Sequence, residues 1–172
     1  MTEKLTEKEM KDERVVELVS KDGQKLRIKR KYIMSSKLIK DMLEEQDDDD
    51  DEIPSIPVPN VESHALKLII EYCEHHWNNK AKEIEKPLKG EFDNLISDYD
   101  KKFLDVDQSR LIELLMASNY MNIRELLTLT CAKVASMIKG KNPTQIRTLF
   151  NIENDFSPEE ERKIREENKW CS

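Results

Sequence analysis

The chain has 172 residues and a formal net charge of −7, with 38% charged and 37% hydrophobic residues. These values allow one domain, or a compact domain with an appendage, whose core is economical. Lys and Arg are scattered along the sequence, which argues against a nucleic-acid partner, and three glycines are too few for a glycine-rich nucleotide fold.

The cysteines and the N-terminal residues indicate an intracellular protein that does not span a membrane. Cys73, Cys131 and Cys171 are odd in number and widely spaced, as expected of free thiols in a reducing compartment. Residues 1–13 are polar and aperiodic, which predicts a disordered tail without a signal peptide, and no apolar run approaches the ~18 residues that span a membrane. We therefore expect a cytoplasmic and nuclear location.

Two short regions predict a small β-sheet. Alternating apolar residues at 15–19 and 26–28 flank Asp22-Gly23, which is the pattern of a β-hairpin. The proline-containing segment 55–60 suits an edge strand, where a missing N–H is tolerated.

A helix and an acidic run lie between these strands. The apolar positions between Ile33 and Leu43 predict a short helix with Ser35 or Ser36 as its N-cap. Residues 44–52 contain eight acids in nine positions. We expect this self-repelling run to be a disordered loop.

The next helix is predicted to be largely buried. Asn60 is expected to cap it, and residues 61–77 carry apolar side chains almost all round. Residues 78–100 contain Pro87 and Gly90 and show no sustained periodicity, so we expect a variable surface loop there.

The remaining sequence is predicted to be helical. Asp107 is expected to cap one helix, and Asn122 with Glu125 resembles the capping box of the next, which would end at Gly140.

Two further helix starts follow, because residues 142–145 and 157–160 each place a proline at the first helical position and Gln or Glu at the third. The last helix is polar, with Ile164 and Trp170 as its only large apolar groups.

No catalytic or metal-binding motif is evident. The sequence contains no GxSxG, P-loop or HExxH pattern. Cys73, His75 and His76 have no second ligand cluster at zinc-site spacing. We expect a protein without enzymatic activity, metal or cofactor.

Several long motifs, in order along the chain, resemble those of one family. The resemblance covers residues 13–172 and is to the S-phase-kinase-associated adaptor family, which links F-box proteins to a cullin. The matching segments are residues 56–61 (IPVPNV), 103–108 (FLDVDQ), 117–123 (ASNYMNI), 137–141 (MIKGK), 150–156 (FNIENDF) and 166–171 (EENKWC).

The resemblance implies an α+β protein with a BTB/POZ fold, a small three-stranded sheet with helices, extended by two C-terminal helices. The BTB/POZ domain would cover residues 14–140, with 44–52 and 78–100 as inserted loops. Residues 141–172 would form the F-box-binding helices. The implied function is that of the adaptor subunit of an SCF-type cullin–RING ubiquitin ligase.

The resemblance also implies partners and site residues. The cullin would contact Asn119 and Tyr120, although a helix C-cap and a partly buried ring would also explain this pair. An RING protein would associate indirectly. The F-box would contact an apolar set that includes one helical stripe: Leu115, Cys131, Val134, Ile138, Phe150 and Trp170. For Trp170, packing on its own domain is an equal alternative.

Two questions stay open from the sequence. The simplest interpretation of Pro158 is a proline at the first position of a helix. The surrounding residues Ser157-Pro158-Glu159 also resemble a site at which some unicellular members of the family hydroxylate and glycosylate a proline. The alternative function is an elongin C-like or self-associating BTB scaffold that does not bind F-box proteins, and homodimerisation of the free chain would fit either function. Residues 142–171 argue against the shorter elongin-type chain.

Overall fold

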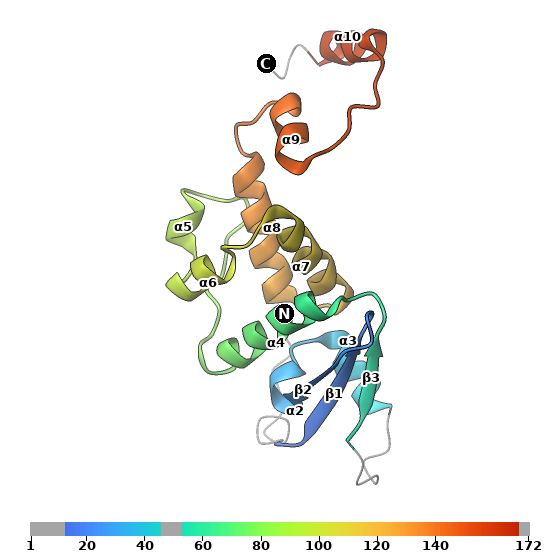
Figure 1. Cartoon of the computed structure of the whole chain (residues 1–172). Helices are drawn as coiled ribbons and strands as arrows, with labels where there is room; N and C mark the ends of the chain where they lie inside the picture. Colours follow the sequence, from blue (N-terminus) through green and yellow to red (C-terminus); the bar gives the residue numbers. More distant parts are fainter. Residues whose placement is uncertain (1–12, 46–52, 169–172) are drawn as a thin grey trace. The chain divides into compact units, whose positions relative to one another are not determined.

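The computed structural model describes residues 13–45 and 53–168, and the expected tail and most of the acidic run lie outside these ranges. Figure 1 shows a small sheet with helices packed against it. The strands are β1 (Val15–Ser20), β2 (Lys25–Lys29) and β3 (Ser55–Val58). The helices are α2 (Arg30–Ile33), α3 (Lys37–Glu44), α4 (Ser63–Asn78), α5 (Phe92–Leu95), α6 (Asp98–Phe103), α7 (Gln108–Tyr120), α8 (Arg124–Ile138), α9 (Pro143–Phe150) and α10 (Pro158–Glu167).

The sheet has the order β2-β1-β3. β1 and β2 form the predicted antiparallel hairpin, in which Leu18 pairs with Leu26. Gly23 adopts a φ of 77° in the turn, a conformation that glycine takes at little cost. β3 runs parallel to β1 with Leu18 beside Ile56, and it is an edge strand, as its proline predicted.

The predicted helix after the hairpin is divided into α2 and α3. The chain leaves the helical conformation at Ser36, whose φ and ψ are −83° and 113°. The Ser36 side chain accepts a hydrogen bond from the Ile39 N–H at 3.3 Å, so Ser36 is the N-cap of α3.

Helix α4 begins at Ser63, and the prediction that Asn60 caps it was wrong. Glu62 occupies the N-cap position without a side-chain capping bond. Asp22 of the hairpin turn supplies the acceptor instead, because its carboxylate receives the Ser63 N–H at 3.0 Å. The cap therefore comes from a residue 41 positions away in the sequence.

The second half of the expected loop 78–100 is helical, so that part of the prediction was wrong. It contains α5 and the start of α6, with Phe92 and Ile96 buried. Ser97 caps α6 by accepting the Asp100 N–H at 3.1 Å. Phe92 and Ile96 are four residues apart, but α5 has four residues and α6 has six, so each helix is too short for a sustained helical period in the sequence.

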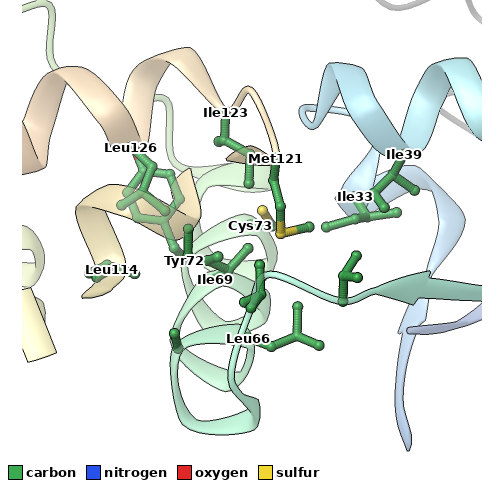
Figure 2. Packing of buried hydrophobic residues seen from close by; sticks show 14 of the residues in the cluster. Ile33, Ile39, Leu66, Ile69, Tyr72, Cys73, Leu114, Met121, Ile123 and Leu126 are labelled. Carbon is green, nitrogen blue, oxygen red and sulfur yellow. The ribbon is translucent and has the colours of Figure 1, made fainter. Parts of the chain in front are cut away.

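One apolar core joins the sheet to helices α2 to α8. Figure 2 shows Leu66, Ile69 and Tyr72 of α4 packed among side chains from the other elements. Each of these three α4 residues is at most 3% exposed. One side of the sheet packs on one face of α4. The opposite face of α4 is exposed at His64, Lys67, Glu71 and Glu74, so the prediction of a largely buried helix holds for one face only.

The chain divides into two compact units, Met1–Met137 and Ile138–Ser172. The whole buried hydrophobic core belongs to the first unit, with Ala132 as its last member. In the second unit, α9 and α10 have no buried residue. Within the described residues, no helix is long and apolar enough to cross a membrane.

Candidate partner-binding surfaces

Helix α7 has a buried face and an outward face. The Asp107 side chain accepts the Arg110 N–H at 3.0 Å, which confirms Asp107 as the N-cap. The buried face consists of Leu111, Leu114, Ala117 and Ser118. Residues at the complementary helical positions are therefore directed away from the core.

The outward face of α7 carries apolar side chains together with the predicted cullin-binding pair. Met116 is 61% exposed and Ile112 is 37% exposed. Asn119 is exposed, and Tyr120 is partly buried and packs against the core. These residues and the partly buried Leu115, at spacings of three and four, form the α7 outer face: Ile112, Leu115, Met116, Asn119 and Tyr120.

The structure groups the predicted site residues differently from the sequence in one respect. Leu115, which was assigned to the F-box, shares a helix face with Asn119, which was assigned to the cullin. Ile112 and Met116 were not predicted as site residues. Because α7 is apolar on both sides, its sequence pattern could not indicate which side would stay exposed.

The turn between α7 and α8 is built on Asn122, and the predicted capping box there was wrong. Asn122 adopts a φ of 52°, and α8 begins two residues later. The Ile123 N–H donates to the Ser118 carbonyl at 3.0 Å, and the Asn122 N–H donates to the Asn119 carbonyl at 3.1 Å. This is a Schellman motif, in which Asn122 ends α7 rather than starting α8.

Helix α3 holds this turn in place. The Ser36 hydroxyl donates to the Met121 carbonyl at 2.6 Å, and the Lys37 N–H donates to the Asn122 carbonyl at 3.4 Å. Ser36 and Met121 are both buried. The position of Asn119 and Tyr120, immediately before this turn, is therefore set by contacts with a different part of the chain.

Helix α8 carries the predicted apolar stripe. Its buried face includes Leu126 and Leu129. Cys131 is exposed, Val134 is partly buried against the core, and Ile138 is 38% exposed. Cys131 and Ile138 of the stripe are therefore accessible to a partner, whereas Val134 also packs against the core.

Local capping organises the second unit. Asn142 and Gln145 exchange capping-box bonds at the start of α9, and Ser157 and Glu160 do so at the start of α10. Both helix starts were predicted correctly. The bonds from Ser157 to the Glu160 carboxylate lower the pKa of Glu160.

Arg147 connects the parts of the second unit. Its guanidinium lies 3.1 Å from the Glu161 carboxylate and 5.6 Å from the centroid of the Phe156 ring. The Asn154 side-chain amide donates to the same carboxylate at 3.0 Å. Polar and cation–π contacts thus take the place of a buried core in this unit.

The second unit also exposes apolar side chains. Ile152, Phe156 and Ile164 are between 40% and 54% exposed, and Phe150 is partly buried. Trp170 lies outside the described residues. Pro158 is exposed at the first position of α10, as predicted for a helix-start proline.

Cys73, His75 and His76 are each engaged in packing. The Cys73 sulfur lies 3.4 Å from the Ser35 hydroxyl, and burial raises the pKa of the thiol to about 12. His75 stacks on Tyr99. His76 Nε2 lies 3.2 Å from Asp100 Oδ1. Nowhere in residues 13–45 and 53–168 do three potential metal ligands gather.

Comparison with known proteins identifies the family. Residues 14–78 match the model of the Skp1 family tetramerisation domain, and residues 124–171 match the model of the Skp1 family dimerisation domain. The S-phase kinase-associated protein 1 homolog of Tetrahymena thermophila is 46% identical over 158 residues, which are 91% of this chain and 93% of that protein. The chain belongs to the Skp1 family.

Relatives from plants and fungi show similar coverage. SKP1-like protein 11 of Arabidopsis thaliana is 43% identical over 92% of this chain and 97% of its own length. The E3 ubiquitin ligase complex SCF subunit sconC of Aspergillus fumigatus is 44% identical over 91% of this chain and 97% of its own length. Family membership confirms the expected resemblance, and the match of the first domain confirms the α+β BTB/POZ fold.

Proposed function

We propose that this chain is the non-catalytic adaptor subunit of an SCF-type cullin–RING ubiquitin ligase, in which it joins F-box proteins to a cullin. The proposal rests on membership of the Skp1 family and on relatives that are named as SCF subunits. The observation that carries it is the exposure of large apolar side chains on helices α7 and α8 and in the second unit. Large exposed apolar patches on soluble proteins usually mark binding surfaces.

The cullin is proposed to bind the α7 outer face. Met116 and Asn119 are exposed there, and Tyr120 presents a ring that is rooted in the core. Such a ring loses little conformational freedom on binding, which is one reason why aromatic residues are frequent hot spots. The RING protein is proposed to join the complex through the cullin.

The F-box is proposed to bind the exposed parts of α8 and the second unit. Cys131 and Ile138 are exposed on α8, and Phe156 and Ile164 are exposed in the second unit. Leu115, Val134, Phe150 and Trp170 stay in this proposed set from the sequence. An F-box protein would then place its substrate within reach of the ubiquitin-transferring subunits.

The decisive experiment is reconstitution with separate variants for each surface. The chain is co-expressed with an F-box protein, isolated by size exclusion, and tested for binding to the N-terminal domain of a cullin. Ile138→Asp should abolish F-box binding and leave cullin binding intact, whereas Asn119→Ala/Tyr120→Ala should have the opposite effect. Ile138 is preferred to Val134 because Val134 contributes to core packing, so Val134→Asp could unfold the chain.

A matched control is Ile53→Asp, since Ile53 is 46% exposed and lies on neither proposed surface. It should bind both partners normally. Cullin binding without any F-box binding would favour the self-associating or elongin C-like scaffold, and binding to neither would contradict the adaptor proposal. Light scattering on the free chain in the same size-exclusion run tests homodimerisation, and imaging of a fluorescent fusion tests the proposed cytoplasmic and nuclear location.

Hydroxylation and glycosylation of Pro158 is a separate proposal. Pro158 is exposed and lies in a capping box, so its ring is accessible without unfolding α10. The intact mass of the protein purified from its natural source should then show added oxygen and sugar. A mass that matches the unmodified sequence would contradict this proposal.

A further inference from the structure

Strand β2 is an edge strand that also carries unusual charge. Its neighbour on one side is β1, and no described strand lies on the other side (Figure 1). Five of the seven residues from 25 to 31 are Lys or Arg, in a chain whose net charge is −7. The positive charge is thus concentrated at one margin of the sheet.

The ladder between β1 and β2 determines which backbone groups face outward. The Ser20 N–H donates to the Gln24 carbonyl at 2.9 Å, and the Arg30 N–H donates to the Arg14 carbonyl at 2.7 Å. In an antiparallel pair, hydrogen-bonded and non-hydrogen-bonded residue pairs alternate. The residues of β2 that are opposite Val15, Glu17 and Val19 therefore direct their backbone groups away from β1.

These residues are Lys29, Arg27 and Lys25. The hydrogen bonds of β1 support this assignment. Glu17, which is opposite Arg27, directs its N–H away from β2, because this N–H donates to the Pro54 carbonyl beside β3 at 2.9 Å. Lys29 is also the N-cap of α2, so its C=O accepts the first hydrogen bond of that helix. Within residues 13–45 and 53–168, the outward groups without a backbone partner are therefore those of Lys25 and Arg27 and the N–H of Lys29. The edge therefore offers free backbone groups at the same positions that carry positive side chains.

Few carboxylates balance these cations. Lys25 and Arg27 share the carboxylate of Glu17, at 2.9 Å and 3.6 Å. Lys29 and Lys31 likewise share the carboxylate of Glu13, and Glu74 adds a more distant attraction for Lys29. The side chains of Lys25 and Arg27 are 64% and 65% exposed. Among the described residues, these four cations outnumber the carboxylates that pair with them or attract them.

An aromatic pair lies at the end of this edge. Tyr32 and Trp77 are both partly exposed, and their ring centroids are 5.8 Å apart. Lys31 Nζ lies 5.2 Å from the centroid of the Tyr32 ring. Lysines on an edge strand are sometimes present solely to prevent aggregation. That role does not account for the two partly exposed aromatic rings beside them.

We propose that the outer edge of β2 binds an acidic segment of a partner protein, which adds to the sheet as an extended strand. The backbone groups of Lys25 and Arg27 and the N–H of Lys29 would pair with the added strand, as in other cases of strand addition. Carboxylates on alternate residues of the segment would face the three cations, because both strands share a period of two residues. Tyr32 and Trp77 would receive an apolar side chain at one end.

The test uses the full-length protein and a fluorescein-labelled peptide of about eight residues, an ordinary strand length. The peptide alternates Glu with Val and ends in Phe, and its binding is measured by fluorescence anisotropy. Lys25→Glu/Arg27→Glu should weaken binding by about tenfold or more, and Lys25→Gln/Arg27→Gln should have an intermediate effect. Circular dichroism checks that the variants are folded.

Controls separate strand addition from general attraction. Lys89→Glu/Lys102→Glu changes the net charge equally on exposed residues that are not part of the proposed site and should leave the affinity unchanged. N-methylation of the peptide amides that face β2 should weaken binding, because these groups could no longer donate. Absence of binding, equal loss in the control variant, or equally tight binding of single-stranded DNA with the same charge would overturn the proposal. No F-box protein or cullin takes part, so failure here leaves the adaptor function untouched.

Discussion

At the scale of single residues, Asp22 joins two elements that are distant in the sequence. Its carboxylate accepts hydrogen bonds from the Ser20 hydroxyl at 2.6 Å, the Ser63 hydroxyl at 2.7 Å and the Ser63 N–H at 3.0 Å. The bonds from Ser20 and Ser63 lower the pKa of Asp22 to about 2. A turn residue of the hairpin thus also caps the central helix α4.

The low pKa of Asp22 predicts a pH dependence of stability. A carboxyl group whose pKa is lower in the folded state stabilises the fold above its unfolded pKa, and this contribution is lost as the pH falls through the folded value. For Asp22 the loss should occur between about pH 4 and about pH 2. Urea unfolding across this range should show a steeper fall in stability for the wild type than for Asp22→Asn. Asp105→Asn, at an exposed carboxyl, serves as control and should behave like the wild type.

Asp100 is a buried carboxyl with a structural role. It is 2% exposed and lies 3.2 Å from His76 Nε2, and it accepts the Ser97 hydroxyl at 2.7 Å. Burial alone would raise its pKa, but the His76 and Ser97 contacts outweigh burial and lower it. The carboxylate therefore links α6 to α4 from within the core.

Replacement of Asp100 should accordingly be costly. Asp100→Asn should lower the free energy of unfolding by about 2 kcal/mol, since it removes a charge-assisted contact from a buried position. Asp98→Asn, two residues earlier, removes a carboxyl that is 91% exposed and should have almost no effect. Urea denaturation at neutral pH compares the two, and equal losses would mean that the His76 contact contributes little.

At the scale of elements, the turn between α7 and α8 determines where Asn119 and Tyr120 are presented. The turn depends on the left-handed conformation of Asn122, with a φ of 52°, and on the bonds from α3. Asn is tolerated there better than other residues that carry a Cβ atom, and glycine is tolerated best.

Substitutions at Asn122 should therefore separate conformation from side-chain chemistry. Asn122→Ala should lower the free energy of unfolding by about 1 kcal/mol, because the left-handed conformation disfavours Cβ. Asn122→Gly should leave stability nearly unchanged or raise it slightly. Thermal unfolding provides the measurement, and a larger loss for Gly than for Ala would show that the Asn side chain, rather than its backbone conformation, matters.

At the scale of the whole molecule, the two units differ in how they are stabilised. The first unit contains the entire buried hydrophobic core, whereas α9 and α10 have no buried residue and rely on capping boxes and on Arg147. Burial of apolar surface is the main source of folding free energy. The first unit therefore has the means to fold by itself.

Truncation tests this difference. A chain that ends at Gly140 should unfold cooperatively at a temperature close to that of the full chain, because no core residue is removed. Under the proposed function it should still bind the cullin and should lose the F-box. Loss of a cooperative transition in calorimetry would show that the second unit contributes to the stability of the first.

The sequence predicted those elements whose determining contacts are local. The Asp22-Gly23 hairpin, the caps at Ser36 and Asp107, and the two proline helix starts all depend on partners within a few residues. The errors concern Asn60, the capping box at Asn122, and the helices within residues 78–100. In each of these cases a distant contact or burial against the core outweighed the local signal.

The sequence by itself determined the family, the α+β class, and the stripe of Cys131, Val134 and Ile138, because long ordered motifs and helical spacing need no tertiary information. Only the tertiary structure decided that Ile112 and Met116 are exposed, that Val134 also packs on the core, and that Lys25 and Arg27 direct their backbone groups away from β1. The physical reason is that exposure and strand register depend on which neighbours an element has. The residues of a helix that is apolar on two sides do not show which side is exposed. The residues of a strand that pairs on one edge do not show which edge remains unpaired.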